Sequence, residues 1–257
     1  MLPLSKRPDD VELQEIDTLE EPFPFQCRPG LACFNRCCRE AVIILSPYDV
    51  LRLSRGLGLS TGEFLRRHTR REEEAASGLP LVLLRPGREG GCPFRGEEGC
   101  RVYAHRPAAC RLFPLAQGSE LTSEGVRDRF FLRRLDYCEG FQGEARETLR
   151  QWLSGQGFFE ADAPRRPWLN LLLREGEPGR PPLDHRLLSQ FYLLAYDLDG
   201  FRTFIMESAL LKTHGLSPEE AEALKTDDLV LLRASAAYLE QILFPDTAPP
   251  LRQALRT

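Results

Sequence analysis

The stretch Phe25-Gln-Cys27-Arg-Pro-Gly-Leu-Ala-Cys33-Phe-Asn-Arg-Cys37-Cys38 decides how the first half of this chain folds. It holds four of the eight cysteines in the 257-residue chain. Clustered thiols are costly to order and reactive, so a bound ligand is the usual reason for them where thiols are kept reduced. Four thiolates satisfy Zn²⁺ tetrahedrally or anchor the irons of an iron–sulfur cluster. The cluster therefore predicts a metal site.

A second group of cysteines follows further along the chain, and no cysteine lies beyond residue 138. The predicted metal ligands are Cys27, Cys33, Cys37, Cys38, Cys92, Cys100, Cys110 and Cys138. No C-x₂-C knuckle and no bacterial ferredoxin run occurs among them. Adjacent side chains diverge, so Cys37 and Cys38 could serve two different ions, or one of them could be a supporting or reactive thiol. Eight sulfurs would fill two four-thiolate sites, or one site with spares.

The residues around the cysteines fit ligation. Glycines allow the backbone to curl close to sulfur at Gly30, Gly91 and Gly99. Four thiolates on one Zn²⁺ leave a net charge of −2, which nearby guanidinium groups would offset. The arginines that flank the cysteines are Arg28, Arg36, Arg39, Arg101 and Arg111.

Two longer motifs carry a resemblance to a known family. They are Cys92-Pro-Phe and Cys100-Arg-Val-Tyr103-x-x-Arg106-Pro107-x-x-Cys110-Arg111-x-Phe113-Pro114. Together with the Cys37-Cys38 pair and the late Cys138-Glu-Gly140, they resemble the YkgJ-like cysteine-cluster family over roughly residues 25–143. This family's name describes a domain that chelates zinc or iron, and the resemblance implies the same chemistry here. Five residues separate Cys27 from Cys33, a longer spacing than many members have.

Composition and periodicity predict a mostly helical α+β protein. We expect an N-terminal arm over residues 1–24, a small irregular cysteine-cluster domain with short strands over 25–143, and a helical C-terminal region over 144–257. Short strands are predicted over 41–45, 79–84 and 129–133. Helices are predicted to begin at Ser46-Pro47 and Ser60, and to cover 147–153, 183–197, 201–212 and 227–243, with another beginning at Ser217-Pro218.

The bulk numbers limit the cellular setting and the partners. The net charge is −4, which argues against nucleic-acid binding. The N-terminal sequence lacks a signal peptide's apolar region, and no apolar run approaches the ~20 residues of a membrane helix. We therefore expect a cytoplasmic protein without a membrane partner. The predicted partner is the metal ion or cluster, and the sequence leaves open whether there is a protein partner.

Three other groups of residues have both a functional and a structural interpretation. His105 could complete a Cys₃His site or lie in a solvated loop. Tyr103, Arg106 and Arg111 could orient thiolates or a substrate; alternatively, Tyr103 packs in the core and Arg106-Pro107 begins a helix. In the tail, a polar set could be an active-site group or an ordinary helix surface with ion pairs: Asp197, Asp199, Arg202 and Glu207.

Three functions are compatible with these features. The first is a metal-binding module that holds zinc or an iron–sulfur cluster, two cofactors that thiolates suit equally. The second is an iron–sulfur-dependent enzyme, either a redox enzyme or a protein-modifying one, since flagellin lysine methylases resemble this family in their cysteine motif. The third is a thiol redox sensor in which Cys37 or Cys38 forms a reversible disulfide. The sequence does not decide whether the protein is an enzyme, and it identifies no catalytic residue.

Overall fold

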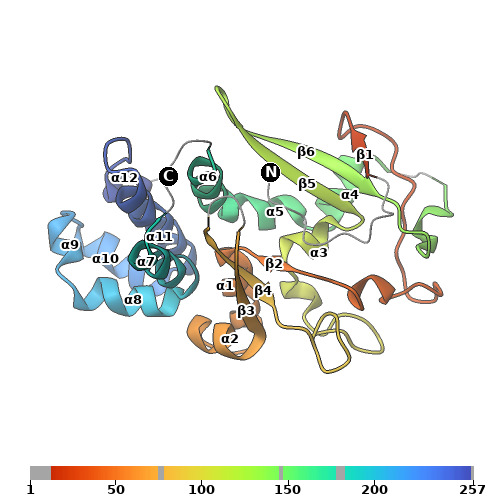
Figure 1. The fold of residues 1–257 in the computed structure, drawn as a ribbon, viewed down its shortest axis with the longest axis horizontal. Coiled ribbons are helices and arrows are strands. Elements are labelled where there is room, and N and C mark those ends of the chain that lie inside the picture. The colour runs from red at the N-terminus through yellow and green to blue at the C-terminus, as the bar shows by residue number, and fades with distance from the viewer. Residues whose placement is uncertain (1–12, 75–77, 145–146, 178–182, 256–257) are drawn as a thin grey trace. The chain divides into compact units, whose positions relative to one another are not determined.

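The protein divides into two compact units, each built from two separate stretches of chain (Figure 1). The first unit contains residues 1–44 and 83–162, and the second contains residues 45–82 and 163–257. The computed structural model describes residues 13–74, 78–144, 147–177 and 183–255. All eight cysteines belong to the first unit.

The first unit contains a three-stranded antiparallel sheet. Its strands are β1 (Leu13–Ile16), β5 (Leu115–Thr122) and β6 (Gly125–Arg133), in the order β1-β6-β5. β5 and β6 form a hairpin in which Thr122 pairs with Gly125, and the backbone at Gly125 has φ +113°. Only glycine adopts such a conformation without strain, so this residue permits the tight connection. β1 falls in the region predicted to be a loose arm.

Apolar side chains from the sheet and from short helices form the core of this unit. The helices are α3 (Ala108–Leu112), α4 (Leu149–Gly155) and α5 (Phe158–Asp162). The buried cluster consists of Phe23, Phe25, Leu112, Leu115, Leu132, Leu149, Leu153 and Phe158. Thr148 caps α4 by accepting a hydrogen bond from the N–H of Gln151, whose side chain accepts in turn from the N–H of Thr148. This core supports one side of the cysteine loops.

The second unit begins with two capped helices and a strand: α1 (Pro47–Gly56), α2 (Thr61–His68) and β3 (Thr69–Glu73). Ser46 caps α1 in a buried capping box with Asp49, and Ser60 caps α2 by accepting from the N–H of Glu63. Both predicted helix starts are confirmed. The reason is local, because Ser before Pro or Thr satisfies backbone donors that the first helical turn leaves without partners.

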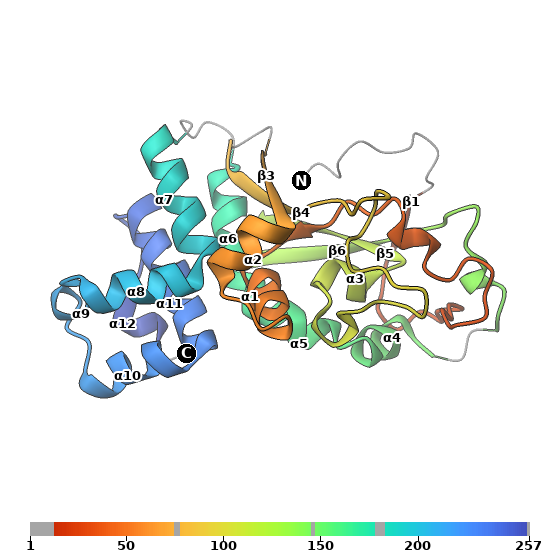
Figure 2. The same ribbon diagram turned by 90° about the horizontal axis from the view of Figure 1, so that it is seen from below.

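The rest of the second unit is helical and is organised around α11 (Asp228–Leu243). The other helices are α6 (Arg166–Glu175), α7 (His185–Tyr196), α8 (Leu198–Glu207), α9 (Leu210–Thr213), α10 (Pro218–Thr226) and α12 (Leu251–Ala254), and a 3₁₀ turn, η4, covers Ala163–Arg165. α11 contacts α6, α7, α8, α10 and α12 (Figure 2). Its buried face carries Ala234, Ser235 and Ala237, which are small enough for neighbouring helices to approach closely. No helix in the described ranges is long and apolar enough to cross a membrane.

A second sheet has the strand order β2-β4-β3, with β2 covering Ile44–Leu45 and β4 covering Pro80–Leu84. The chain leaves the first unit after Ile44 and returns to it at Leu83. At this point the N–H of Leu84 donates to the carbonyl of Ile43 at 2.9 Å. The departing and returning chains are therefore hydrogen-bonded neighbours.

The α+β, mostly helical fold class is confirmed, with small three-stranded sheets and a helical C-terminal region. Two local predictions need correction. The strand predicted over 41–45 contains only Ile44 and Leu45, and the helix predicted over 201–212 is divided into α8 and α9. The predicted domain boundaries at residues 24/25 and 143/144 stay a prediction. They divide the chain into continuous segments, whereas each compact unit is built from two separate segments.

Candidate metal centre

Backbone contacts bring the first and the last cysteine segments together. The N–H of Gln26 donates to the carbonyl of Gly140 at 2.8 Å, which places Cys27 beside the segment that carries Cys138. A Cβ at Gly140 would lie 2.5 Å from the ring of Phe25, so only glycine permits this approach. Phe25 is buried among Phe23, Phe113, Phe141 and Trp152, which fix its ring.

Cys33 is held against the same late segment by Glu139. The N–H of Glu139 donates to Cys33 Sγ at 3.3 Å, while the Glu139 side chain accepts from the N–H of Ala32 at 3.0 Å. Burial raises the pKa of Cys138, the N–H of Gly140 lowers it, and the nearby Cys33 sulfur raises it again. The early cysteine Cys33 and the late cysteine Cys138 are thus neighbours, although they are far apart in sequence.

Cys37 and Cys38 lie in a short 3₁₀ helix, η1 (Arg36–Cys38), which follows Asn35 in a left-handed conformation with φ 62°. The two thiols are hydrogen-bonded. This hydrogen bond lowers the pKa of Cys37, and it raises the pKa of Cys38, which burial raises further. The charge of Arg95 opposes the shift at Cys38 by favouring its thiolate.

The second cysteine loop lies directly on η1. The N–H of Cys92 donates to the carbonyl of Cys38 at 2.8 Å. Gly91 has φ +64°, and a Cβ there would lie 2.3 Å from the carbonyl oxygen of Arg39 and 2.5 Å from that of Cys38. Any side chain at this position would push the loop away, so Gly91 sets the distance between Cys38 and Cys92.

The loop then folds back on itself and brings Cys100 near Cys92. Arg95 and Cys100 form an isolated antiparallel bridge, and the N–H of Arg101 donates to the carbonyl of Phe94 at 3.0 Å. Burial raises the pKa of Cys100, the N–H of Val102 lowers it, the Cys38 sulfur raises it, and the charge of Arg106 lowers it. Cys38, Cys92 and Cys100 are therefore close enough to influence one another.

Two buried arginines tie the loop between Cys100 and Cys110 to the end of α4. Arg111 donates to the carbonyls of Arg106 (3.1 Å), Gln156 (2.8 Å) and Ala104 (2.9 Å). Arg106 donates to the carbonyls of Tyr103 and Gln156 and to the Gln156 side chain. These contacts explain the Arg-Pro-x-x-Cys-Arg part of the motif, because they fix the loop that leads into helix α3, on which Cys110 lies.

Tyr103 does not pack in the core. Its side chain is 59% exposed, and the Arg106 guanidinium lies 3.9 Å from the centroid of its ring. The alternative in which Tyr103 is a core residue is therefore wrong. The prediction that Arg106-Pro107 begins a helix agrees with the structure, because Pro107 directly precedes helix α3. His105 is half-buried at the end of the 3₁₀ turn η2 (Tyr103–His105).

The structure gathers the eight predicted ligands in one unit, but their thiols do not converge on one point. Within the described ranges, no three Cys, His, Asp or Glu side chains lie in an arrangement that could hold a metal ion. The sulfurs instead make pairwise contacts, Cys37 with Cys38 and Cys33 with Cys138. Cys27 is exposed and the other seven are partly buried. The donor chemistry fits zinc or iron, and binding requires that side chains turn toward a common centre.

Sequence reasoning missed three residues that organise this region. Arg95 acts electrostatically on Cys38, Glu139 holds the segment of Cys33, and the backbone and side chain of Gln156 receive the two buried arginines. Glu139 follows Cys138 in the late motif, so its position was a usable signal. No local pattern marks Gln156, because the arginines to which its carbonyl and side chain are hydrogen-bonded lie at least 45 positions earlier in the sequence.

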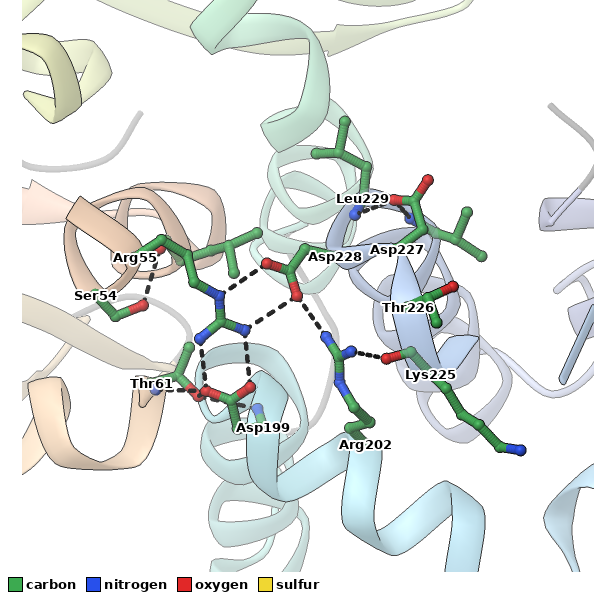
Figure 3. A network of polar contacts seen from close by, with 12 residues as sticks. Ser54, Arg55, Thr61, Asp199, Arg202, Lys225, Thr226, Asp227, Asp228 and Leu229 are labelled. Atoms are coloured by element: carbon green, nitrogen blue, oxygen red, sulfur yellow. Dashed lines mark hydrogen bonds and ion pairs between the residues drawn. The ribbon is translucent and has the colours of Figure 1, made fainter. Parts of the chain in front are cut away.

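The polar set in the tail is an ion-pair network within the second unit (Figure 3). Arg55 forms two hydrogen bonds to the carboxylate of Asp199 (2.8 and 2.9 Å) and two to that of Asp228 (2.8 and 3.0 Å). Arg202 also pairs with Asp228, and Thr61 donates to Asp197 at 2.8 Å. Since Asp199 and Arg202 are engaged in joining α1, α8 and α11, the helix-surface interpretation is the better one.

Comparison with known proteins supports a metal-binding domain. Residues 26–139 match the family model CxxCxxCC, described as a "Putative zinc- or iron-chelating domain". No curated protein and no solved structure matched the chain. The matched region contains every cysteine of the chain. It covers parts of both segments of the first unit and also residues 45–82 of the second unit.

Proposed function

We propose that this chain, whose residues 26–139 match the model of the zinc- or iron-chelating CxxCxxCC family, is a metal-binding protein that holds its metal through clustered cysteine thiolates. The observation that carries the proposal is that all eight cysteines, which come from separate loops, lie in one compact unit, where Gly91, Gly140 and Glu139 hold these loops against one another. Such clustering of thiols is costly without a ligand.

The metal would be zinc or the iron of an iron–sulfur cluster, and either would stabilise the first unit by crosslinking its loops. Arg95 near Cys38 and Arg106 near Cys100 favour the thiolate form of these cysteines, and thiolates are the ligands of zinc and of iron–sulfur clusters alike. We place the protein in the cytoplasm, where thiols remain reduced and available as ligands. The metal is the one partner that the site chemistry supports.

An iron–sulfur-dependent enzyme is the alternative. Two surface hollows occur in the second unit, one lined by Tyr48, Trp168 and Leu239 among others, and one lined by Asn170, Arg233 and Glu240 among others. Neither is lined by a cysteine. An enzyme would need an open coordination position or cluster beside a substrate cavity.

The test is elemental analysis and visible spectroscopy of protein purified without oxygen. Zinc with a colourless solution supports a binding or structural module. Iron with acid-labile sulfide and a broad brown absorbance supports a cluster and would reopen the enzyme alternative. Protein that carries neither metal, and takes up neither on reconstitution, would refute the proposal.

A further inference from the structure

The second unit carries a hollow of about 160 Å³ on its helical surface. Three helices form it, because α6 and α12 both contact α11. The lining residues are Pro167 and Asn170 on α6, Arg233, Ala236, Ala237 and Glu240 on α11, and Ala254 on α12. At about 30 Å³ for each water molecule, the hollow has room for about five, which suits a ligand much smaller than a drug.

One face of α11 forms the floor of this hollow. Arg233, Ala236, Ala237 and Glu240 occupy positions i, i+3, i+4 and i+7, which lie on the same face of a helix. The two alanines are buried and too small to fill the space above them. Seven residues of helix span about 10 Å, so a cationic residue and an anionic residue flank an apolar middle.

The two charged residues differ in whether their charge is offset. Glu240 forms an ion pair with Arg174. Arg174 is fixed in turn by a hydrogen bond to Thr247 at 3.0 Å and by the ring of Phe244, whose centroid lies 3.8 Å from its guanidinium carbon. Arg233 is half-buried, and its buried Nε has no hydrogen-bond partner in the part of the chain that the structure describes. A buried donor without a partner costs free energy, and the cost is larger for a charged group.

We propose that this hollow binds a small organic acid whose carboxylate pairs with Arg233. A guanidinium donates two parallel hydrogen bonds to a carboxylate, and Nε can be one of the donors. Asn170, on α6, supplies an amide donor at the same hollow. The apolar part of the acid covers Ala236 and Ala237, where phosphate would leave an oxygen without a donor. This site contains no cysteine and does not depend on metal binding in the first unit.

The test follows the Nε–H signal of Arg233 by ¹H–¹⁵N NMR in the full-length reduced protein, at constant ionic strength. The loss of this signal in Arg233→Gln assigns it. The probes are butyrate, its uncharged amide butyramide, and inorganic phosphate. We expect a saturable shift with butyrate, at concentrations at least about tenfold lower than with phosphate, and no shift with butyramide, because the amide lacks the charge that pairs with the guanidinium.

Two variants distinguish a specific site from general attraction of anions. Arg233→Gln removes the proposed partner, whereas Arg186→Gln removes an exposed arginine on α7 and changes the net charge equally. The backbone N–H signals of Ala236 and Ala237 report binding in both variants. Butyrate should bind about 10- to 100-fold more weakly to Arg233→Gln, because a charged donor pair is lost, and with unchanged affinity to Arg186→Gln. Far-UV circular dichroism checks that both variants keep their helices.

Four results would overturn the proposal. Equal weakening in the two variants would indicate general attraction of anions, and equal affinity for butyrate and phosphate would indicate an unselective anion site. The absence of a saturable shift with butyrate would leave water as the occupant of the hollow. Tighter binding of a short peptide through its C-terminal carboxylate than of butyrate would identify a peptide, and not a free acid, as the ligand.

Discussion

Gly91 illustrates how much the candidate site depends on single backbone positions. Its missing side chain lets the loop of Cys92 rest on the carbonyls of Cys38 and Arg39. Its neighbour Gly90 has φ +80° and no atom within 4 Å of an added Cβ. The two glycines share a left-handed backbone and differ in the space around them, so they form a matched pair for mutation.

We expect Gly91→Ala to destabilise the first unit by about 3 kcal/mol, because left-handed strain of about 1–2 kcal/mol is added to a clash between backbone atoms. Gly90→Ala should cost only the strain, about 1–2 kcal/mol. Chemical denaturation of both variants measures the difference. Gly91→Ala should also lower the number of metal equivalents bound. Equal losses of stability in the two variants would show that the close approach is unimportant.

At the scale of elements, Arg111 connects α3 to the end of α4 by donating to the carbonyl of Gln156. The side chain is 8% exposed and donates to three carbonyls. Arg111→Ala should reduce the free energy of unfolding by about 2–4 kcal/mol, because the buried carbonyls lose their donors. Lysine lacks the planar guanidinium group that donates to several carbonyls at once, so Arg111→Lys should retain only part of the stability that Arg111→Ala loses.

Arg101 supplies the control for this prediction. It is exposed and donates to a single carbonyl, that of Pro93. Arg101→Ala should cost no more than about 1 kcal/mol, because water replaces the lost contact. Thermal unfolding of the three variants tests the order, and a loss as large at Arg101 as at Arg111 would contradict it.

The network around Arg55 predicts how the second unit responds to acid. Hydrogen bonding from Arg55 lowers the pKa of Asp199 to about 2, from an ordinary value of 3.8, while burial opposes the shift. The folded state therefore binds fewer protons than the unfolded state between these values. The stabilisation is complete above pH 3.8 and is lost as the pH falls toward 2.

Asp199→Asn should remove this part of the acid sensitivity, because the amide does not titrate. Glu207→Gln changes an exposed acid on the same helix and serves as the matched control. Helix content followed from pH 5 to pH 2 should show the transition weakened in Asp199→Asn and unchanged in Glu207→Gln. An identical acid transition in Asp199→Asn and the wild-type protein would contradict the assignment.

The sequence predicted the elements whose ends carry local signals. Ser46, Ser60 and Ser217 cap their helices as expected, and the strand ending at Leu84 is present. β1, β3 and β5 were not predicted, because none of them contains a continuous apolar run. β1 also depends on pairing with β6, which lies far along the chain. The cysteines were visible as a set, whereas Glu139 and Gln156 act through contacts that sequence spacing does not reveal.

At the scale of the whole molecule, the segment 45–74 lies between Cys38 and Cys92 in sequence but belongs to the second unit. Removing the metal with a chelator should therefore increase hydrogen exchange in residues 25–44 and 83–143, and leave α1 and α2 protected. Mass spectrometry of exchanged peptides measures this directly. If α1 and α2 lose protection together with the cysteine loops, the units do not unfold independently.

The contact between Glu139 and Cys33 also has a consequence for biosynthesis. The two residues are 106 positions apart, and chains are synthesised at about 5–20 residues per second. About 5–20 s therefore pass between the synthesis of Cys33 and the synthesis of Glu139. During this interval the early thiols lack the hydrogen bond from Glu139, so a metal site that includes Cys33 would be completed only after this late segment has been made.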